Sequence, residues 1–372
     1  MRIIKESLEE FQEVEFFLDK SNSLDGLTKV PINTYQKGIV FCDENLKNSW
    51  WKDIEIILSK NLFIDGVKFL TPSETTKSID EYKNLVEYLG ERKCSRDTLI
   101  IAIGGGTILD AVAYLASTYM RGIPLMMIPT TLIGQADAST AGKTCINTSY
   151  SKNALGTLYL PKFVYNNVCI LKTNSPYELR QGFSEIFKYG LLGSQSLLEL
   201  LSQYSIKQTD ATLLKILSET IKVRMKLRKA DPLSSNFGHT FGHALEKISN
   251  YAVNHGDAIS VGMVMAMYFS VDEGIVSKRF VNKIINMMLD LGLNTKIAKD
   301  ICPAELTKLM LTDKKSSNTE IRLVLISDIA KPYKDKISPF YSVKPTKIES
   351  FLRKFNKKLE FLDSSHWQGL KS

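Results

Sequence analysis

Short apolar runs alternate with helical stretches through the first half of this chain of 372 residues. Runs typical of buried strands occupy residues 38–42, 67–70, 98–103 and 125–128, and helical spacing fills 78–90 and 110–119. Alternation of this kind is typical of βαβ units, because parallel strands need a long crossover connection. The sequence therefore predicts a Rossmann-like α/β domain with a mainly parallel sheet.

From about residue 175 the pattern changes to long stretches with a helical period. They occupy residues 176–190, 196–203, 211–230, 238–248, 258–272 and 278–292. We therefore predict two domains, an α/β domain at residues 1–174 and a mainly α-helical domain at 175–372. A chain of this length is long enough for two domains with substantial cores.

Composition excludes several classes of protein. The net charge of +8 could favour an anionic substrate, but the lysines are scattered and form no basic stripe, so we expect no nucleic-acid partner. No stretch approaches the roughly 20 apolar residues that span a bilayer, so we expect no membrane partner. The 5 cysteines are dispersed, without a paired motif, which is typical of a reducing compartment. We expect a cytoplasmic protein.

Three of the chain's 4 histidines, His239, His243 and His255, lie in one short segment beside glycines. His239 and His243 are four residues apart, so on a helix both rings project from one face. Neutral imidazole is a common ligand of zinc-like cations, usually together with a carboxylate and an open position. The alternative is a set of hydrogen-bonded histidines in a helix-packing seam.

A glycine triplet, Gly104 to Gly106, follows the apolar run 98–103 and opens a helical stretch. Glycines allow the backbone to approach a pyrophosphate, and the following helix offers unpaired N–H groups. A tight strand-to-helix turn would have the same sequence, so nucleotide binding and a purely structural turn both remain open.

Two pairs of oppositely charged residues are further candidates for a functional site. Asp137 and Lys143 flank a run of small residues, which suits either a loop lining a polar cleft or a solvent-exposed loop. Glu185 and Lys188 lie three residues apart on a predicted helix, and most such pairs are surface ion pairs. A glutamate on one helix and two imidazoles on others could, however, form an open three-ligand metal site.

In combination these motifs resemble the 3-dehydroquinate synthase family, the sugar phosphate cyclases, over roughly residues 38–345. The similar segments follow the family's order, and their joint occurrence is far more specific than any one of them. They are residues 74–78, 104–110, 120–122, 128–132, 137–144, 152–153, 185–188, 236–243, 255–256 and 313–315.

The resemblance implies two cofactors. Glu185, His239 and His255 would be the ligands of a zinc or cobalt ion that binds substrate oxygens as a Lewis acid. A larger set would bind NAD. It comprises Asp43, Asn45, Glu74, Lys77, Gly105, Gly106, Thr107, Asp110, Thr130, Thr131, Lys152 and Thr173.

The resemblance also implies a catalytic cycle on a sugar phosphate substrate. A secondary alcohol is transiently oxidised by NAD, phosphate leaves, the hydride returns, and an intramolecular aldol step closes a carbocycle, which makes the enzyme a carbon–oxygen lyase. Asp137 and Lys188 would manage the hydroxyl proton, and Arg121 would reach the site of a second subunit in a homodimer. The phosphate would be held by Lys143, Asn153, Asn236, His243 and Lys314.

The sequence departs from the family where the substrate carboxylate is held. Arg224 stands where a lysine is expected, and the segment 233–235 is too short to contain the arginine that normally follows. Loss of a charge-assisted partner of a buried carboxylate would cost about 2–5 kcal/mol. Two alternatives remain open. In the first, Lys226, Arg228 or Lys229 replaces the missing partner, and the chain is a 3-dehydroquinate synthase of the shikimate pathway, which feeds aromatic amino acid biosynthesis. In the second, the substrate lacks the carboxylate, as sedoheptulose 7-phosphate and glucose 6-phosphate do in cyclases of secondary metabolism.

Two other classes of protein remain open from the sequence. A metal- and NAD-dependent polyol or glycerol phosphate dehydrogenase has a similar fold and would release NADH. A ligand-binding pseudoenzyme is disfavoured, because a decayed site is expected to lose its metal ligands, whereas Glu185, His239 and His255 are all present.

Overall fold

The computed structural model describes residues 1–9, 12–149, 151–204, 210–230, 234–296, 301–313, 316–317, 319–334 and 338–355. They fall into two compact units. The first is Met1–Ser175 with Thr209–Ser218, and the second is Pro176–Gln208 with Glu219–Ser372. Among the described residues, no helix combines the length and the apolar character needed to cross a bilayer.

The first unit is built on one seven-stranded sheet with the strand order β1-β2-β9-β6-β5-β3-β4. Strands β1 and β2 are antiparallel, and every other neighbouring pair is parallel, which confirms the predicted fold class. The strands are β1 (Arg2–Glu9), β2 (Gln12–Asp19), β3 (Lys37–Asp43), β4 (Ile64–Leu70), β5 (Thr98–Gly104), β6 (Leu125–Pro129) and β9 (Phe163–Asn167).

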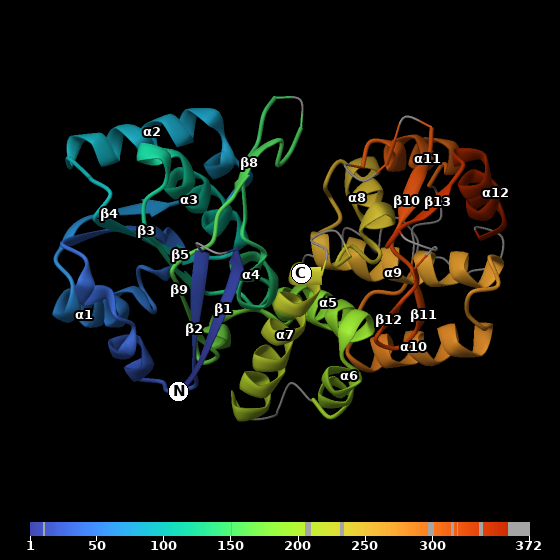
Figure 1. Cartoon of the computed structure of the whole chain (residues 1–372), viewed down its shortest axis with the longest axis horizontal. Coiled ribbons are helices and arrows are strands. Elements are labelled where there is room, and N and C mark those ends of the chain that lie inside the picture. The colour runs from blue at the N-terminus through green and yellow to red at the C-terminus, as the bar shows by residue number, and fades with distance from the viewer. Residues whose placement is uncertain are drawn as a thin grey trace. The chain divides into compact units, whose positions relative to one another are not determined.

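Helices cover both faces of this sheet (Figure 1). On one face, Val40 and Ile101 share an apolar cluster with Ile54 of α1 (Trp51–Asn61). On the other face, Phe41 meets Tyr88 of α2 (Ile79–Glu91) at a ring separation of 6.0 Å, beside α3 (Gly106–Thr118). All of β5 is buried, which explains why residues 98–103 read as an uninterrupted apolar run.

Short elements lie between the strands of the first unit and carry several of the predicted site residues. A two-stranded hairpin, β7 (Lys143–Ile146) with β8 (Leu155–Leu158), is the largest of them. A π-helix, η6 (Gly134–Ala138), leads into α4 (Ser139–Ala141). The 3₁₀ turns are η1 (Asp25–Lys29), η2 (Ile32–Thr34), η3 (Glu44–Leu46), η4 (Glu74–Lys77), η5 (Tyr119–Arg121) and η7 (Ile170–Thr173).

The second unit is mainly helical, as predicted, and α7 enters it only after Ser218. Its helices are α5 (Pro176–Gly193), α6 (Gln195–Ser202), α7 (Asp210–Ala230), α8 (His239–Ile248), α9 (His255–Asp272), α10 (Lys278–Asp290), α11 (Pro303–Leu311) and α12 (Pro345–Phe355). Two small antiparallel sheets were not predicted, because their strands are too short to show a period. They pair β10 (Ile321–Leu323) with β13 (Tyr341–Val343), and β11 (Ile326–Asp328) with β12 (Lys331–Pro332).

Helices α8 and α9 approach each other at glycines. A Cβ atom at Gly242 would lie 3.0 Å from the carbonyl oxygen of Ala258, and one at Gly262 would collide with the carbonyl oxygen of Gly238. Gly238 itself has a φ of +76°, a conformation that side chains rarely adopt. The glycines beside the histidines therefore serve the backbone contact between the two helices.

We expect Gly262→Ala to lower the free energy of unfolding by about 3 kcal/mol, because the added methyl group must push α8 away from α9. Urea denaturation followed by circular dichroism measures this. Gly90→Ala is the matched control, since Gly90 is a helical glycine with nothing within 4 Å of the added atom. There we expect a gain of about 0.5–1 kcal/mol from helix propensity. Equal stability of the two variants would contradict the close contact.

Candidate active site

One carboxylate and two imidazoles converge in the second unit. Glu185 lies on α5, His239 is the first residue of α8, and His255 is the first residue of α9. The Oε1 atom of Glu185 lies 3.6 Å from Nε2 of His239 and 3.3 Å from Nε2 of His255. The three ligand atoms lie within 4.8 Å of one another. The three residues predicted as metal ligands are thus brought together.

Hydrogen bonds orient both imidazoles toward this point. Nδ1 of His239 lies 3.1 Å from the carbonyl oxygen of Phe237, and Nδ1 of His255 lies 3.3 Å from Oε1 of Glu246. Both partners are acceptors, so each bond needs the proton on Nδ1 and leaves the Nε2 lone pair for a ligand. A carboxylate with two Nε2 donors fits a zinc-type cation.

Without a bound cation, the carboxylates of Glu246 and Glu185 favour the protonated form of the His255 imidazole. Burial alone lowers the pKa of the His255 imidazole, but the carboxylates of Glu246 and Glu185 outweigh burial and hold that pKa well above its usual range. A cation bound at Nε2 would have to displace a proton from this ring, so metal binding is expected to release protons.

Lys188 is part of the same buried group. Its ammonium pairs with Glu185, and the two residues are 1% and 0% exposed, so the alternative of a surface ion pair is wrong. The ammonium also lies 4.3 Å from the ring centre of Tyr189. Arg224 of α7, only 2% exposed, places its guanidinium carbon 5.5 Å from that ring. Two buried cationic side chains, those of Lys188 and Arg224, therefore lie close to the ring of Tyr189.

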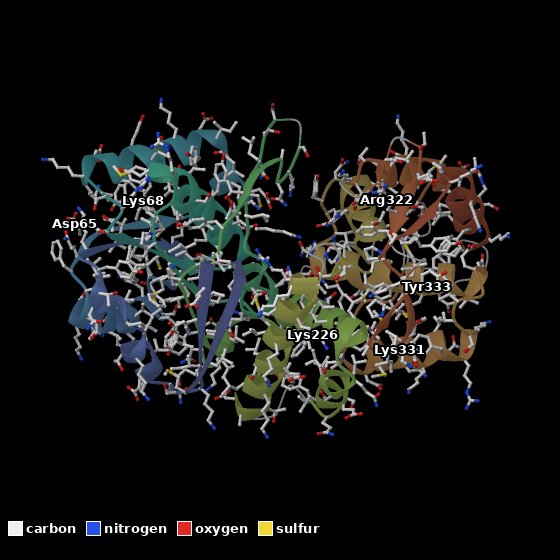
Figure 2. All side chains as sticks on the ribbon, in the orientation of Figure 1. Asp65, Lys68, Lys226, Arg322, Lys331 and Tyr333 are labelled. Carbon is white, nitrogen blue, oxygen red and sulfur yellow. The ribbon has the colours of Figure 1, made fainter. Side chains whose placement is uncertain are left out.

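The other basic residues of α7 lie differently. Lys226 (labelled in Figure 2) and Lys229 are exposed, and Arg228 is half-buried. Of the four residues considered for the substrate carboxylate, Arg224 is therefore the one whose side chain the fold buries.

His243 turns toward a different partner from the two candidate ligands. Its Nδ1 atom lies 3.3 Å from Oδ2 of Asp313, although its ring centre is only 5.2 Å from that of His239. Asn236 is buried and accepts, through its carbonyl oxygen, the backbone N–H of His239. Lys314, predicted to contact phosphate, lies outside the described residues, as does residue 233 of the short segment; Ser234 and Ser235 are described.

In the first unit, most of the residues predicted to bind NAD lie at or just after the carboxyl ends of parallel strands. Ligands of open α/β sheets bind at that edge. The set follows β3, β4, β5, β6 and β9 in turn, with one residue on the β7–β8 hairpin. In that order it is Asp43 and Asn45; Glu74 and Lys77; Gly105, Gly106, Thr107 and Asp110; Thr130 and Thr131; Thr173; and Lys152.

The turn after β5 has the features of a phosphate site. Gly105 caps α3 without any side-chain hydrogen bond to the first turn. A Cβ atom on Gly105 would lie 3.1 Å from Cγ2 of Thr131, so a side chain there would crowd the loop after β6. The first turn of α3 also contains no acidic residue. Its N–H groups and the helix dipole are therefore suited to an anion.

Lys77 connects the β7–β8 hairpin to helix α3 at the carboxyl edge of the sheet. Its Nζ atom lies 2.9 Å from Oδ2 of Asp110 and 2.5 Å from Oδ1 of Asn153. Burial alone lowers the pKa of the Lys77 ammonium, but Asp110 and Cys145 together outweigh burial and raise that pKa above its ordinary value. Glu74 accepts a hydrogen bond of 2.7 Å from Asn147 and lies 3.5 Å from Lys152.

The remaining predicted residues of the first unit lie on turns and the hairpin. Asp137 is half-buried in the π-helix η6, a type of element frequent at functional sites. Lys143, exposed, begins β7. Arg121 is exposed on a turn in which Met120 and Arg121 have φ values of 47° and 65°.

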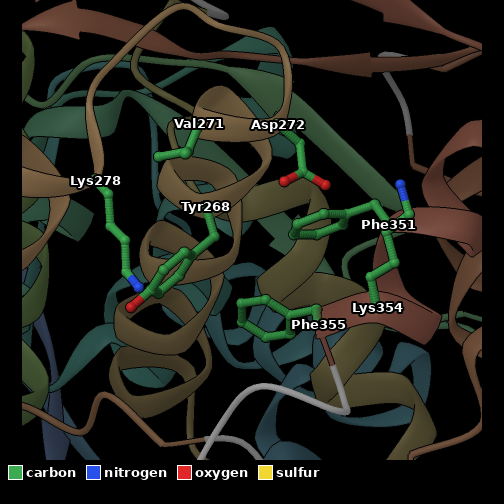
Figure 3. Close-up of a pocket in the computed structure, with 7 residues that line it drawn as sticks. All are labelled: Tyr268, Val271, Asp272, Lys278, Phe351, Lys354 and Phe355. Atoms are coloured by element: carbon green, nitrogen blue, oxygen red, sulfur yellow. The ribbon is translucent and has the colours of Figure 1, made fainter.

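A separate hollow in the second unit contains none of the predicted site residues (Figure 3). Its volume is about 130 Å³, below the roughly 300 Å³ of ordinary ligand pockets. It is lined by Tyr268, Val271, Asp272, Lys278, Phe351, Lys354 and Phe355.

Sequence reasoning missed three residues of these clusters, Glu246, Asn147 and Cys145. Glu246 was visible as the residue seven positions after His239, and therefore on the same helix face. Asn147 and Cys145 belong to the hairpin, and the Sγ atom of Cys145 lies 3.3 Å from Oδ2 of Asp110. Burial and the Asp110 carboxylate raise the pKa of the Cys145 thiol to about 12, which keeps the thiol protonated.

Solved structures with a similar fold include cyclases and dehydrogenases. The structure of 2-deoxy-scyllo-inosose synthase complexed with carbaglucose-6-phosphate, NAD⁺ and Co²⁺ has a TM-score of 0.83 at 21% identity and covers 95% of this chain and 99% of that chain. The 2-epi-5-epi-valiolone synthase from Streptomyces hygroscopicus, with NAD⁺ and Zn²⁺ bound, has a TM-score of 0.81 at 20% identity and covers 95% and 99%. An iron-containing alcohol dehydrogenase from Thermotoga maritima reaches 0.63 at 17% identity, covering 92% and 96%. The fold is therefore that of the dehydroquinate synthase-like cyclases.

Proteins of similar sequence identify the family within the dehydroquinate synthase-like fold. The 3-dehydroquinate synthase of Thermoanaerobacter pseudethanolicus is 30% identical over 328 residues, which are 86% of this chain and 92% of the relative. That of Francisella tularensis subsp. tularensis is 35% identical over 271 residues, 70% and 76% of the two chains. The family models of the 3-dehydroquinate synthase N-terminal and C-terminal regions match residues 68–181 and 182–316. This chain belongs to the 3-dehydroquinate synthase family, within the sugar phosphate cyclases.

We expect Zn²⁺ or Co²⁺ to stabilise the metal-free protein by about 2.7 kcal/mol at a hundredfold excess over the dissociation constant. Glu185→Gln should abolish this gain, because it removes the charged ligand, whereas His243→Gln should keep it. Thermal unfolding with and without metal measures both. The opposite result, with stabilisation kept in Glu185→Gln and lost in His243→Gln, would place the cation among His243, Glu246 and His255 instead.

Proposed function

We propose that this protein is a 3-dehydroquinate synthase, which converts a seven-carbon keto-acid phosphate into 3-dehydroquinate with NAD and a divalent cation. The observation that carries this proposal is the convergence of Glu185, His239 and His255 beside the buried Lys188. Family membership supports it, since the relatives at 30% and 35% identity are 3-dehydroquinate synthases.

The two units would hold different cofactors. The domain of residues 1–174 would bind NAD, with the pyrophosphate at the Gly105 turn, and the domain of residues 175–372 would hold zinc or cobalt at Glu185, His239 and His255. When bound, NAD would supply a hydride acceptor that is restored within each turnover, and the cation would polarise the substrate oxygens.

The residues around these cofactors would move and hold the proton of the oxidised hydroxyl. Lys188 is buried against Glu185, and its ammonium would stabilise the negative charge that develops on the substrate oxygen. Asp137 would accept or relay the proton, a role that its half-buried position in η6 permits. Lys143, Asn153, Asn236, His243 and Lys314 would hold the phosphate and stabilise it as it leaves.

Arg224 would hold the substrate carboxylate. It replaces the lysine expected at this position, and its guanidinium is buried against Tyr189, the neighbour of Lys188 in the chain. A guanidinium can bind a carboxylate through two parallel hydrogen bonds, which one lysine cannot do. This single residue would therefore compensate for the arginine absent from the short segment 233–235, and it favours the keto-acid over sedoheptulose 7-phosphate.

A homodimer forms part of this proposal, with Arg121 reaching the partner's site. Two exposed apolar side chains belong to the same region, Met120 at 46% and Leu158 at 66% exposure. Tyr159, next to Leu158, donates a hydrogen bond of 2.7 Å to the carbonyl oxygen of Ile123 and so ties the hairpin to the turn of Arg121. Exposed apolar side chains and an exposed arginine in the same region are typical of subunit interfaces.

We place the enzyme in the shikimate pathway, in the cytoplasm. The names of the sequence relatives support the pathway. All five cysteines are free thiols, as is usual in a reducing compartment.

A dehydrogenase with net NAD reduction is the rival function, because iron-containing alcohol dehydrogenases share the fold. We expect the metal-loaded enzyme with NAD to release phosphate from the seven-carbon keto-acid phosphate without accumulating NADH. A phosphate assay and absorbance of the nicotinamide ring measure the two quantities. Sedoheptulose 7-phosphate and glucose 6-phosphate are the control substrates. Stoichiometric NADH would contradict cyclisation, and turnover of a control substrate alone would contradict the proposed product.

We expect Arg224→Met to lower kcat/KM for the keto-acid phosphate about 30-fold or more, because losing a buried charge-assisted partner costs about 2–5 kcal/mol. Lys226→Met is the matched control, since Lys226 lies on the same helix but is exposed, and its kcat/KM should stay unchanged. Circular dichroism checks that both variants fold. Equal kcat/KM values for the two variants would remove Arg224 from carboxylate binding.

A further inference from the structure

Glu246 is an acidic residue with no assigned role that lies against a candidate metal ligand. It is on α8, seven residues after His239 and three after His243, so the three side chains share one helix face. Its Oε1 atom lies 3.3 Å from Nδ1 of His255, the nitrogen on the far side of the ring from Glu185. Its side chain is largely buried, at 17% exposure.

The two candidate imidazole ligands have different hydrogen-bond partners at Nδ1. Nδ1 of His239 faces a neutral group, the backbone carbonyl of Phe237, whereas Nδ1 of His255 faces the carboxylate of Glu246. A carboxylate behind an imidazole orients the ring, keeps the proton on Nδ1 and increases the basicity of Nε2. The ring of His255 is therefore held more firmly, and by a charged group.

We propose that Glu246 is a positioning residue of the metal centre, which aims Nε2 of His255 at the cation and strengthens cation binding without itself being a ligand. This inference rests on the proposed metal site at Glu185, His239 and His255. It adds a side-chain contact between two of the helices of that site, because Glu246 of α8 meets the first residue of α9.

The geometry also contains a competing arrangement. Ligand atoms of His243, Glu246 and His255 lie within 4.8 Å of one another, so a cation could use Glu246 directly. In that arrangement Glu246 would be a ligand of the cation and Glu185 would not. The two arrangements differ in how strongly each carboxylate affects metal affinity.

The test is the dissociation constant of Zn²⁺, measured by competition with a chromophoric chelator on the full-length protein. Glu246→Gln keeps a neutral acceptor like the carbonyl behind His239, and should weaken binding about 10-fold. Glu246→Ala removes the acceptor, and should weaken binding up to about 100-fold. Glu273→Gln is the matched control, since Glu273 pairs with Tyr341 and Lys347 instead, and its affinity should equal that of the wild type.

Two further readouts separate positioning from a general loss of structure. All variants should bind one Zn²⁺ per chain, and the d–d absorption of bound Co²⁺ should shift in the Glu246 variants but not in Glu273→Gln. Unchanged affinity in both Glu246 variants would overturn the inference. Loss of binding in Glu246→Gln as complete as in Glu185→Gln would also overturn it, by making Glu246 a ligand. Absence of Zn²⁺ binding in the wild type would instead refute the metal site of the proposed function.

Discussion

Helix α9 packs against α5 and α8 at glycine residues, and the arrangement of the second unit depends on this close packing. A Cβ atom on Gly256 would lie 2.5 Å from Cα of Gln181, and one on Gly262 would collide with the backbone of Gly238, so α9 approaches both α5 and α8 more closely than side chains allow. Glu185 and the two imidazoles converge because their backbones do. The same contacts place His239 and His255 at the starts of two helices, where the helix dipoles favour the nearby carboxylate.

Burial of charge at this contact has consequences for both stability and function. Glu185 and Lys188 are removed from water, and an ion pair in such a place stabilises little unless further hydrogen bonds satisfy it. Beside this pair, α5 and α9 are joined by a polar contact of their own, the hydrogen bond of 2.6 Å from Ser184 to the carbonyl oxygen of Gly256. The charges of Glu185 and Lys188 are thus paired and buried before any ligand binds, which suits a reaction that depends on preorganised charge.

Much of the fold was predictable, and particular elements show why the rest was not. Strand β5 and helix α9 follow from strong local patterns, a continuous apolar run and a long helical period. The antiparallel β1 was not predicted, nor was the β7–β8 hairpin, where Asn147 and Asn153 meet Glu74 and Lys77. Such contacts join residues about seventy positions apart, and no local pattern encodes which distant partner a polar side chain will find.

The sequence by itself determined the chemical inventory, namely the clustered histidines, the glycine turn after an apolar strand, and an order of motifs shared with one family. Only the tertiary structure decided which of these residues meet at the candidate metal site and which have other partners. His239 and His243 lie on one helix face, yet His255 joins His239 beside Glu185, while His243 turns to Asp313. Likewise Arg224 is buried and Lys226 is exposed, although both belong to one basic run. Helical spacing specifies the face of a side chain, but only the packing of a second helix decides which groups that face meets.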